Sequence, residues 1–355
     1  MGAVDRPGID VLYATRLLDL AYFWPSYRSV RRNLPWVNRI VVVVPDADVA
    51  GFADLGLDAE VVGESDLHDG LPGIARGWMR QQVVKLCAHL VSADRPVLVL
   101  DADVLVAQPA PPSLVFEGSM ARCFVERWDG ATHRGWHGAS AKFLGIDRTR
   151  PSIFPTPNVM DTDVLHELHA HLGSGDASRG LAAVIDAAAG VVDETHDPPF
   201  TEWALYGLFA RHLSATATER VRFCESTHVT GVWDDTQWRE RLRHGRWAER
   251  PFLVVHSWLT EDLLTVRRAL AGDPALAPLF TGDGRGGWLI PAGTTMARHG
   301  FARSAVTVER TRLLQAADVE DDDGVHTVFR LRPDRWGADG GGGIMRVATA
   351  ALMGL

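Results

Sequence analysis

Residues 97–106, with the sequence VLVLDADVLV, constrain the fold more than any other stretch of the chain. The run Val97–Leu100 is apolar without interruption and leads into Asp101 and Asp103, after which a second apolar run covers residues 104–106. An unbroken run of this kind predicts a strand buried on both faces of a sheet. Carboxylates at the end of such a strand must be paired, hydrogen-bonded or bound to a cation. The pattern therefore favours a site for Mg²⁺ or Mn²⁺ carrying a diphosphate; the alternative is a strand that ends in a solvated turn.

The segments that precede this strand alternate between strand and helix patterns. Strands are predicted at residues 10–15, 39–45 and 59–62, and helices at 17–33 and 77–91. This order predicts an α/β fold with a mainly parallel, Rossmann-like sheet flanked by helices. Ligands of such sheets bind outside the carboxyl ends of the strands, which is where Asp101 and Asp103 fall.

The second half of the sequence is less regular. We expect strands at 120–126 and 252–255, a long loop at 129–140, and helices at 161–172, 174–190 and 200–213, the last with Thr201 at its N-cap. The composition changes after residue 280, where glycine-rich and acidic segments separate alternating apolar stretches. We therefore expect one domain over residues 1–280 and a small β-rich C-terminal extension over 281–355 with a flexible end.

Composition excludes several classes of function. A net charge of −9 argues against nucleic-acid binding, which favours a basic face. The three cysteines are scattered without CxxC spacing, which predicts neither a zinc site nor disulfides and favours a reducing, cytoplasmic location. No stretch has the roughly twenty apolar residues that a membrane span needs. Many of the twelve tryptophans have Gly, Asp or Arg neighbours, which suits stacking on a sugar or base, although core packing is the commoner role; examples are Trp78, Trp136, Trp233 and Trp258.

Six segments in a fixed order resemble a known family. Over roughly residues 8 to 270 the chain resembles a bacterial family of DxD-containing glycosyltransferases with the GT-A fold, through DVLYAT, GWMRQQVVK, VLVLDADV, TPNV, TEWALYG and VVHSW. The resemblance implies a metal-dependent transferase that uses a nucleotide-activated sugar. A divalent ion that bridges the phosphates would stabilise the leaving nucleoside diphosphate.

The resemblance also implies roles for individual residues. Asp103 would bind Mn²⁺ or Mg²⁺ directly, Asp101 would bind the metal or the nucleotide, and His256 would complete the metal site; a buried structural role is the alternative for His256. Thr15 and Asp19 resemble the family's contacts to base or ribose.

Four polar residues on the predicted helix 77–91 are further candidates for donor binding. Arg80 and Lys85 would offset the charge of the diphosphate, unless they form a solvated face, and Gln81 and Gln82 between them indicate a polar helix side turned toward a ligand.

Acidic residues far along the chain are candidates for the acceptor side of the reaction. Glu202 falls in the first turn of a predicted helix, where a carboxylate either complements the helix dipole or acts as general base. Asp234 and Asp235 are rivals for that role, and Asp163 and His137 are weaker candidates.

The leading hypothesis is transfer of a sugar, most simply from a UDP-sugar, to the hydroxyl of a carbohydrate, lipid-linked or small-molecule acceptor, by inversion or retention. One alternative is a nucleotidyltransferase, although the segment ATRLLDLAYFW after the first strand lacks the glycine-rich loop expected of one. The other is a catalytically silent sugar-binding or nucleotide-binding protein of the same fold.

Overall fold

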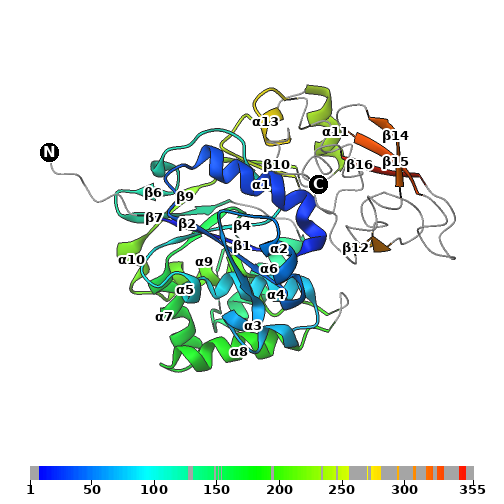
Figure 1. Cartoon of the computed structure of the whole chain (residues 1–355). Coiled ribbons are helices and arrows are strands. Elements are labelled where there is room, and N and C mark those ends of the chain that lie inside the picture. The colour runs from blue at the N-terminus through cyan, green and yellow to red at the C-terminus, as the bar shows by residue number, and fades with distance from the viewer. Residues whose placement is uncertain are drawn as a thin grey trace.

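The computed structural model describes residues 8–126, 131–147, 149–150, 152, 154–192, 196–232, 235–244, 247–255, 270 and 273–280, and short strands beyond residue 281 (Figure 1). Its centre is a five-stranded sheet in the order β3-β2-β1-β4-β8. The first four of these strands are mutually parallel and β8 is antiparallel to β4, which confirms the mainly parallel α/β fold. Their bounds are β1 (Asp10–Ala14), β2 (Arg39–Val44), β3 (Glu60–Gly63), β4 (Val97–Leu100) and β8 (Asn158–Met160).

Alternate residues of the central strands enter two different cores, because successive side chains point to opposite faces of a sheet. Leu12 and Val41 belong to the core that also contains side chains from α4 (Gly77–Leu86), α7 (Thr162–Leu172), α8 (Ala177–Ala189) and α9 (Glu202–His212). Val11 and Val42 pack on the other face, against α1 (Leu20–Asn33). Figure 1 shows α1 on one side of the sheet and α4, α7 and α8 on the other.

The chain leaves the central sheet at the two aspartates. After β4 it turns and forms β5 (Val104–Val106), which joins a second sheet in the order β10-β11-β5, built with β10 (Val229–Val232) and β11 (Phe252–Val255). The β5 strand is antiparallel to β11. Asp101 and Asp103 therefore lie at the junction of two sheets.

The loop expected at residues 129–140 is wrong over its described part, because residues 131–143 form helix α6 (Ala131–Phe143). Gly135 and Gly138 gave the segment its loop-like composition, but a Cβ atom added at either position would meet nothing within 4 Å. His137, Ser140 and Ala141 are buried at helical spacing. The amphipathic face, rather than the glycines, determines the structure here.

The remaining predicted elements correspond closely to observed ones. The helix predicted at 77–91 is divided at Cys87 into α4 and α5 (Ala88–Val91). A third sheet, β6-β7-β9, includes the strand predicted at 120–126. The other elements of residues 8–280 are α2 (Val49–Ala53), α3 (Glu64–Leu67), β6 (Phe116–Glu117), β7 (Met120–Val125), α10 (Ala217–Arg220), β9 (Val221–Glu225), α11 (Asp235–His244) and α13 (Ala277–Phe280).

Beyond residue 281 the described elements are all strands. β14 (Ala317–Asp322), β15 (His326–Leu331) and β16 (Ile344–Ala348) form an antiparallel sheet, and β12 (Thr294–Thr295) pairs with β13 (Thr307–Val308). The expected division of the chain at residue 280 stays a prediction. Within the described parts of the chain, no helix combines the length and the apolar character needed to cross a membrane.

Candidate functional site

The candidate site lies at the carboxyl edge of the central sheet, where β1 and β4 end side by side. Thr15 follows β1; its backbone N–H donates to the carbonyl of Val43, 3.1 Å away, and its side chain is buried. The Thr15 hydroxyl has no hydrogen-bond partner among the described residues. Asp101 follows β4, with 29% of its side chain exposed. The parallel register thus brings together two residues that the sequence analysis assigned to donor binding.

Lys85 of α4 connects Asp101 with a second carboxylate. Its ammonium group pairs with Asp101 Oδ1 and lies 2.7 Å from Glu202 Oε1. The side chains of Lys85 and Glu202 are both only 3% exposed, which excludes the solvated-face alternative for Lys85. Burial alone would lower the pKa of Lys85, but the charges of Asp101 and Glu202 outweigh it and raise that pKa. Lys85 therefore carries a permanent positive charge next to the carboxylate of Asp101.

Glu202 is held by the start of its own helix as well as by Lys85. Its backbone N–H donates to Oε1 of Gln82, at 3.2 Å, and the preceding N–H, of Thr201, donates to the hydroxyl of Ser140, at 3.1 Å. Thr201 occupies the predicted N-cap position but makes no side-chain capping bond among the described residues. Burial raises the pKa of Glu202, and Lys85 opposes that rise. The first turn of α9 is thereby bonded to both α4 and α6.

Asp103 is connected to the second sheet. Its carbonyl accepts a hydrogen bond of 3.3 Å from the N–H of Val255, the last residue of β11. His256, the predicted third metal ligand, is the next residue in the chain and lies outside the described residues. Within the described part of the chain, no three His, Cys, Asp or Glu side chains are grouped so as to hold a metal ion.

Tyr22 of α1 is a residue of this edge that the sequence analysis missed. Burial is the main cause of its raised pKa, and the negative charges of Asp103 and Asp19 add to the effect. Asp19 itself pairs with Arg16, with 3.1 Å between Oδ2 and Nε. Tyr22 therefore lies near two of the predicted site carboxylates. Its only signal in the sequence is its position, one helical turn after Asp19.

The other predicted residues are placed elsewhere or lie outside the described parts. Arg80 pairs with the buried Glu64, which follows β3, with 3.0 Å between Nε and Oε1. Gln81 is half-buried on α4. Asp235 begins α11, but its side chain, like the whole of Asp234, is not among the described parts.

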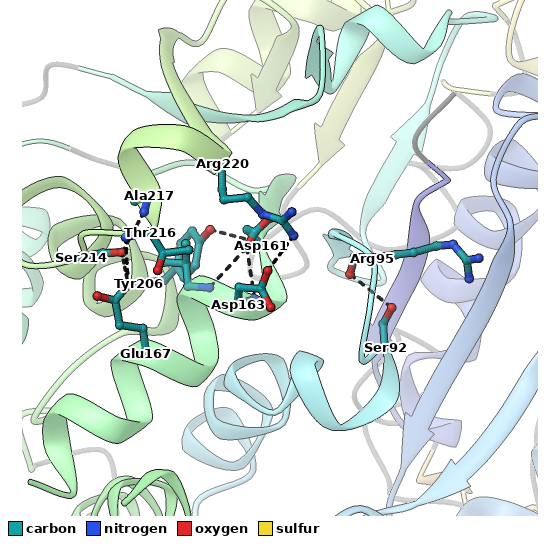
Figure 2. Close-up of polar contacts among 11 residues, drawn as sticks. Ser92, Arg95, Asp161, Asp163, Glu167, Tyr206, Ser214, Thr216, Ala217 and Arg220 are labelled. Carbon is teal, nitrogen blue, oxygen red and sulfur yellow. Dashed lines mark hydrogen bonds and ion pairs between the residues drawn. The ribbon is translucent and has the colours of Figure 1, made fainter. Parts of the chain in front are cut away.

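The two weaker acceptor-side candidates have partners of their own. Figure 2 shows Arg220 between two carboxylates at the start of α7, where its Nε is 3.0 Å from Asp161 and its Nη2 is 2.9 Å from Asp163. His137 of α6 is buried with Nδ1 at 3.2 Å from the carbonyl of Ser152, and burial lowers its pKa. No described contact joins either residue to Lys85.

Comparison with known proteins identifies the family. A family described as a family of unknown function, DUF6492, matches residues 28–276. The chain belongs to this family. The match to DUF6492 includes Lys85, Asp101, Asp103 and Glu202, whereas Thr15, Asp19 and Tyr22 precede it. No curated protein matches this DUF6492 chain.

Several solved structures are similar to this DUF6492 protein. One is the galactosyltransferase LgtC in complex with donor and acceptor sugar analogues, at 14% identity and a TM-score of 0.43, covering 77% of this chain and 96% of that one. Mouse xyloside xylosyltransferase 1 in its apo form is 10% identical, with a TM-score of 0.37 and coverage of 70% and 97%. A glycosyltransferase involved in glycosylation of the major capsid of PBCV-1 is 10% identical, with a TM-score of 0.34 and coverage of 74% and 97%.

Proposed function

We propose that this DUF6492 protein is a metal-dependent glycosyltransferase that moves a sugar from a nucleotide-sugar donor, a UDP-sugar in the first instance, to an acceptor hydroxyl. The observation that carries the proposal is the buried Lys85 ammonium group, which pairs with Asp101 at the carboxyl edge of the sheet and with Glu202 behind it. A fixed cation at this edge suits a ligand whose negative charge grows during the reaction, such as a departing diphosphate.

The residues at the sheet junction fit a divalent metal. Asp103 and Asp101 offer carboxylate oxygens, and the bond from Val255 to Asp103 supports His256, the next residue, as the third ligand. Oxygen and imidazole ligands suit Mn²⁺, and carboxylates also suit Mg²⁺. Lys85 already neutralises part of the charge of Asp101, so Asp103 is the stronger candidate for direct contact. When bound, the metal would neutralise charge on the diphosphate.

The remaining residues of the edge would bind and orient the donor. Thr15, Asp19 and Tyr22 are the candidates for the nucleoside, because the Thr15 hydroxyl has no hydrogen-bond partner among the described residues and the charge of Asp19 acts on Tyr22. Gln82 and Lys85 would position Glu202 and Asp101 rather than contact the substrates themselves. Arg80 and Gln81 stay proposals for diphosphate binding.

The ion pair with Lys85 supports a positioning role for Glu202. A carboxylate that is 3% exposed and bound to a permanent cation is poorly suited to accept a proton from an acceptor hydroxyl. Asp235, at the start of α11, is then the better candidate for a general base.

The test measures binding of UDP by titration calorimetry with and without MnCl₂. We expect wild-type binding to depend on Mn²⁺, and Asp103→Ala to abolish it. Asp94→Ala is the matched control, because this aspartate precedes the same strand at its opposite end and is 73% exposed. Equal affinity of Asp103→Ala and wild type for UDP with Mn²⁺ would refute the proposed site.

A second assay tests the reaction by following release of UDP from UDP-sugars in the presence of candidate acceptors. Release of UDP that is lost in Asp103→Ala supports transfer. Release of pyrophosphate from UTP and a sugar phosphate would establish a nucleotidyltransferase instead. Mn²⁺-dependent binding with neither reaction would favour a silent binding protein.

We also infer a reducing, cytoplasmic location for this chemistry. Cys87, Cys123 and Cys224 are all free thiols, and the first two are buried. Free buried cysteines are typical of proteins in reducing compartments.

A further inference from the structure

Two tryptophans that are 58 positions apart in the sequence meet beside the candidate site. Trp78 of α4 and Trp136 of α6 have ring centroids 5.8 Å apart and planes tilted by 35°. Both residues are half-buried, and Trp78 also packs against the core of the central sheet. The guanidinium of Arg76 lies 4.9 Å from the centre of the Trp78 ring. This group of three residues, Arg76, Trp78 and Trp136, is called the aromatic platform below.

The helices place the platform next to the first turn of α9. Trp78 precedes Gln82 by four residues, one helical turn, and Gln82 accepts the hydrogen bond from the N–H of Glu202. Trp136 likewise precedes Ser140 by one turn, and Ser140 accepts the hydrogen bond from the N–H of Thr201. Each tryptophan is therefore about 6 Å along its helix from a group bonded to the start of α9.

The same face of α4 continues from the platform to the reacting edge. Trp78, Gln82 and Lys85 follow the helical spacing of four and then three residues, so they share one face. Lys85 at its far end pairs with Asp101. At its near end, a Cβ atom on Gly77 would lie 4.0 Å from Nη1 of Arg16, which follows β1. Lys85 is buried and lies about 10 Å along the helix from Trp78, so a ligand held on the platform would lie near Arg16 and two helical turns from Lys85.

Arg76 adds a charge to this aromatic surface. Its Nη1 donates to the carbonyl of His196, at 3.4 Å, and it forms no salt bridge with a carboxylate among the described residues. A guanidinium that stacks on an indole keeps its edge available for a planar or tetrahedral anion. The aliphatic C–H groups of a pyranose ring, which carry partial positive charge, match the negative face of the indole ring.

We propose that the aromatic platform binds the acceptor, and that the acceptor contains a sugar ring bearing a carboxylate or phosphate group. The sugar ring packs on Trp78 and Trp136 while Arg76 pairs with the acidic group. This inference rests on the proposed glycosyltransferase function, because it assigns the platform to the acceptor rather than to the donor.

The experiment uses the full chain labelled with ¹⁵N at the indole nitrogens and records NMR spectra during titration with D-glucuronate, D-glucose 6-phosphate or neutral D-glucose. Trp78→Phe and Trp136→Phe identify the two indole signals. We expect glucuronate or glucose 6-phosphate to shift both signals, and glucose to bind more weakly. The comparison of the two acidic sugars distinguishes a carboxylate from a phosphate.

Substitution of the platform then tests each contact. Arg76→Ala is expected to weaken binding of the acidic sugar by about tenfold, equivalent to about 1.4 kcal/mol. The affinity of this variant for the acidic sugar should then be close to its affinity for glucose. Trp36→Phe is the control, because Trp36 is half-buried beyond the end of α1, before the amino end of β2, and donates to the carbonyl of Ala110. This variant should bind as the wild type does.

Two outcomes would overturn the inference. In the first, neither acidic sugar shifts the signals of Trp78 and Trp136. In the second, Arg76→Ala binds the acidic sugars with the same affinity as the wild type. UDP binding with Mn²⁺ in the same variants separates this result from the proposed function. Retained UDP binding with no sugar response refutes the platform alone, and absence of UDP binding in the wild type refutes the donor site independently of the platform.

Discussion

Replacement of Lys85 by methionine tests the electrostatics of the site most directly. The substitution keeps a long, unbranched side chain but removes the cation between Asp101 and Glu202. At an effective dielectric constant of about 20, two unit charges 2.7 Å apart attract by about 6 kcal/mol. Part of that attraction offsets the desolvation of both groups, and removal of one partner of a buried pair typically costs about 3–5 kcal/mol.

Protonation of Glu202 sets a limit to this cost. Neutralising a glutamate at pH 7, from an ordinary pKa of about 4.3, costs about 3.7 kcal/mol. We therefore expect Lys85→Met to lower the free energy of unfolding by about 3–4 kcal/mol at pH 7. The folded variant then holds a proton on Glu202 that the unfolded chain releases, so its stability falls by about 1.4 kcal/mol for each unit of rising pH. In the wild type Lys85 opposes the rise that burial causes in the pKa of Glu202, so this pH slope should be weaker than in the variant.

Urea unfolding at pH 6, 7 and 8 measures both effects. Lys85→Met/Glu202→Gln should lose the pH slope and recover part of the stability, because no buried carboxylate is then left without its cation. Lys142→Met is the control, since Lys142 is exposed on α6 and its loss should change stability by less than about 0.5 kcal/mol. A Lys85→Met protein that is as stable as the control, with the same pH dependence, would refute the reasoning.

Two further predictions concern stability. Burial lowers the pKa of His169 to about 4, so below pH 6.5 the unfolded chain binds a proton that His169 in the folded protein does not. The free energy of unfolding should therefore fall by up to about 3 kcal/mol between pH 6.5 and pH 4. Urea unfolding at both pH values should show a smaller fall for His169→Phe. A Cβ atom on Gly207 would lie 2.3 Å from the ring of Phe154, so Gly207→Ala should lower the unfolding free energy by about 1–3 kcal/mol, whereas Gly138→Ala, with no atom within 4 Å, should raise it by up to about 1 kcal/mol; equal melting temperatures of the two variants would contradict this.

Local pattern was sufficient to predict the central sheet and its carboxyl edge. Runs such as 40–44 and 97–100 have no polar residue inside the buried strand, so neither helix nor loop competes with them. Helix α6 was missed because its two glycines lower helix propensity, while its stability comes from packing against α9. Helix propensity therefore predicts poorly those helices whose stability comes from tertiary contacts.

The partners within the site could not be predicted in the same way. Lys85 and Glu202 are 117 residues apart, and no local spacing relates them. The same holds for Tyr22, whose relation to Asp103 depends on how α1 packs on the sheet. The sequence identified residue types suited to a charged ligand, whereas their pairing follows from long-range packing.

The spacing of the two aspartates has a structural reason that is independent of the proposed metal site. Asp101 ends the central sheet and is held by Lys85 from α4, while the backbone of Asp103 is held by Val255 of the second sheet. One intervening residue, Ala102, is enough for the chain to turn from one sheet to the other, with the N–H of Val104 donating to the carbonyl of Asp101 at 3.1 Å. The two aspartates are therefore anchored to separate parts of the fold, Asp101 through its side chain and Asp103 through its backbone. A ligand that contacts both would join those parts, which makes the position of β11 as important to the site as the position of β4.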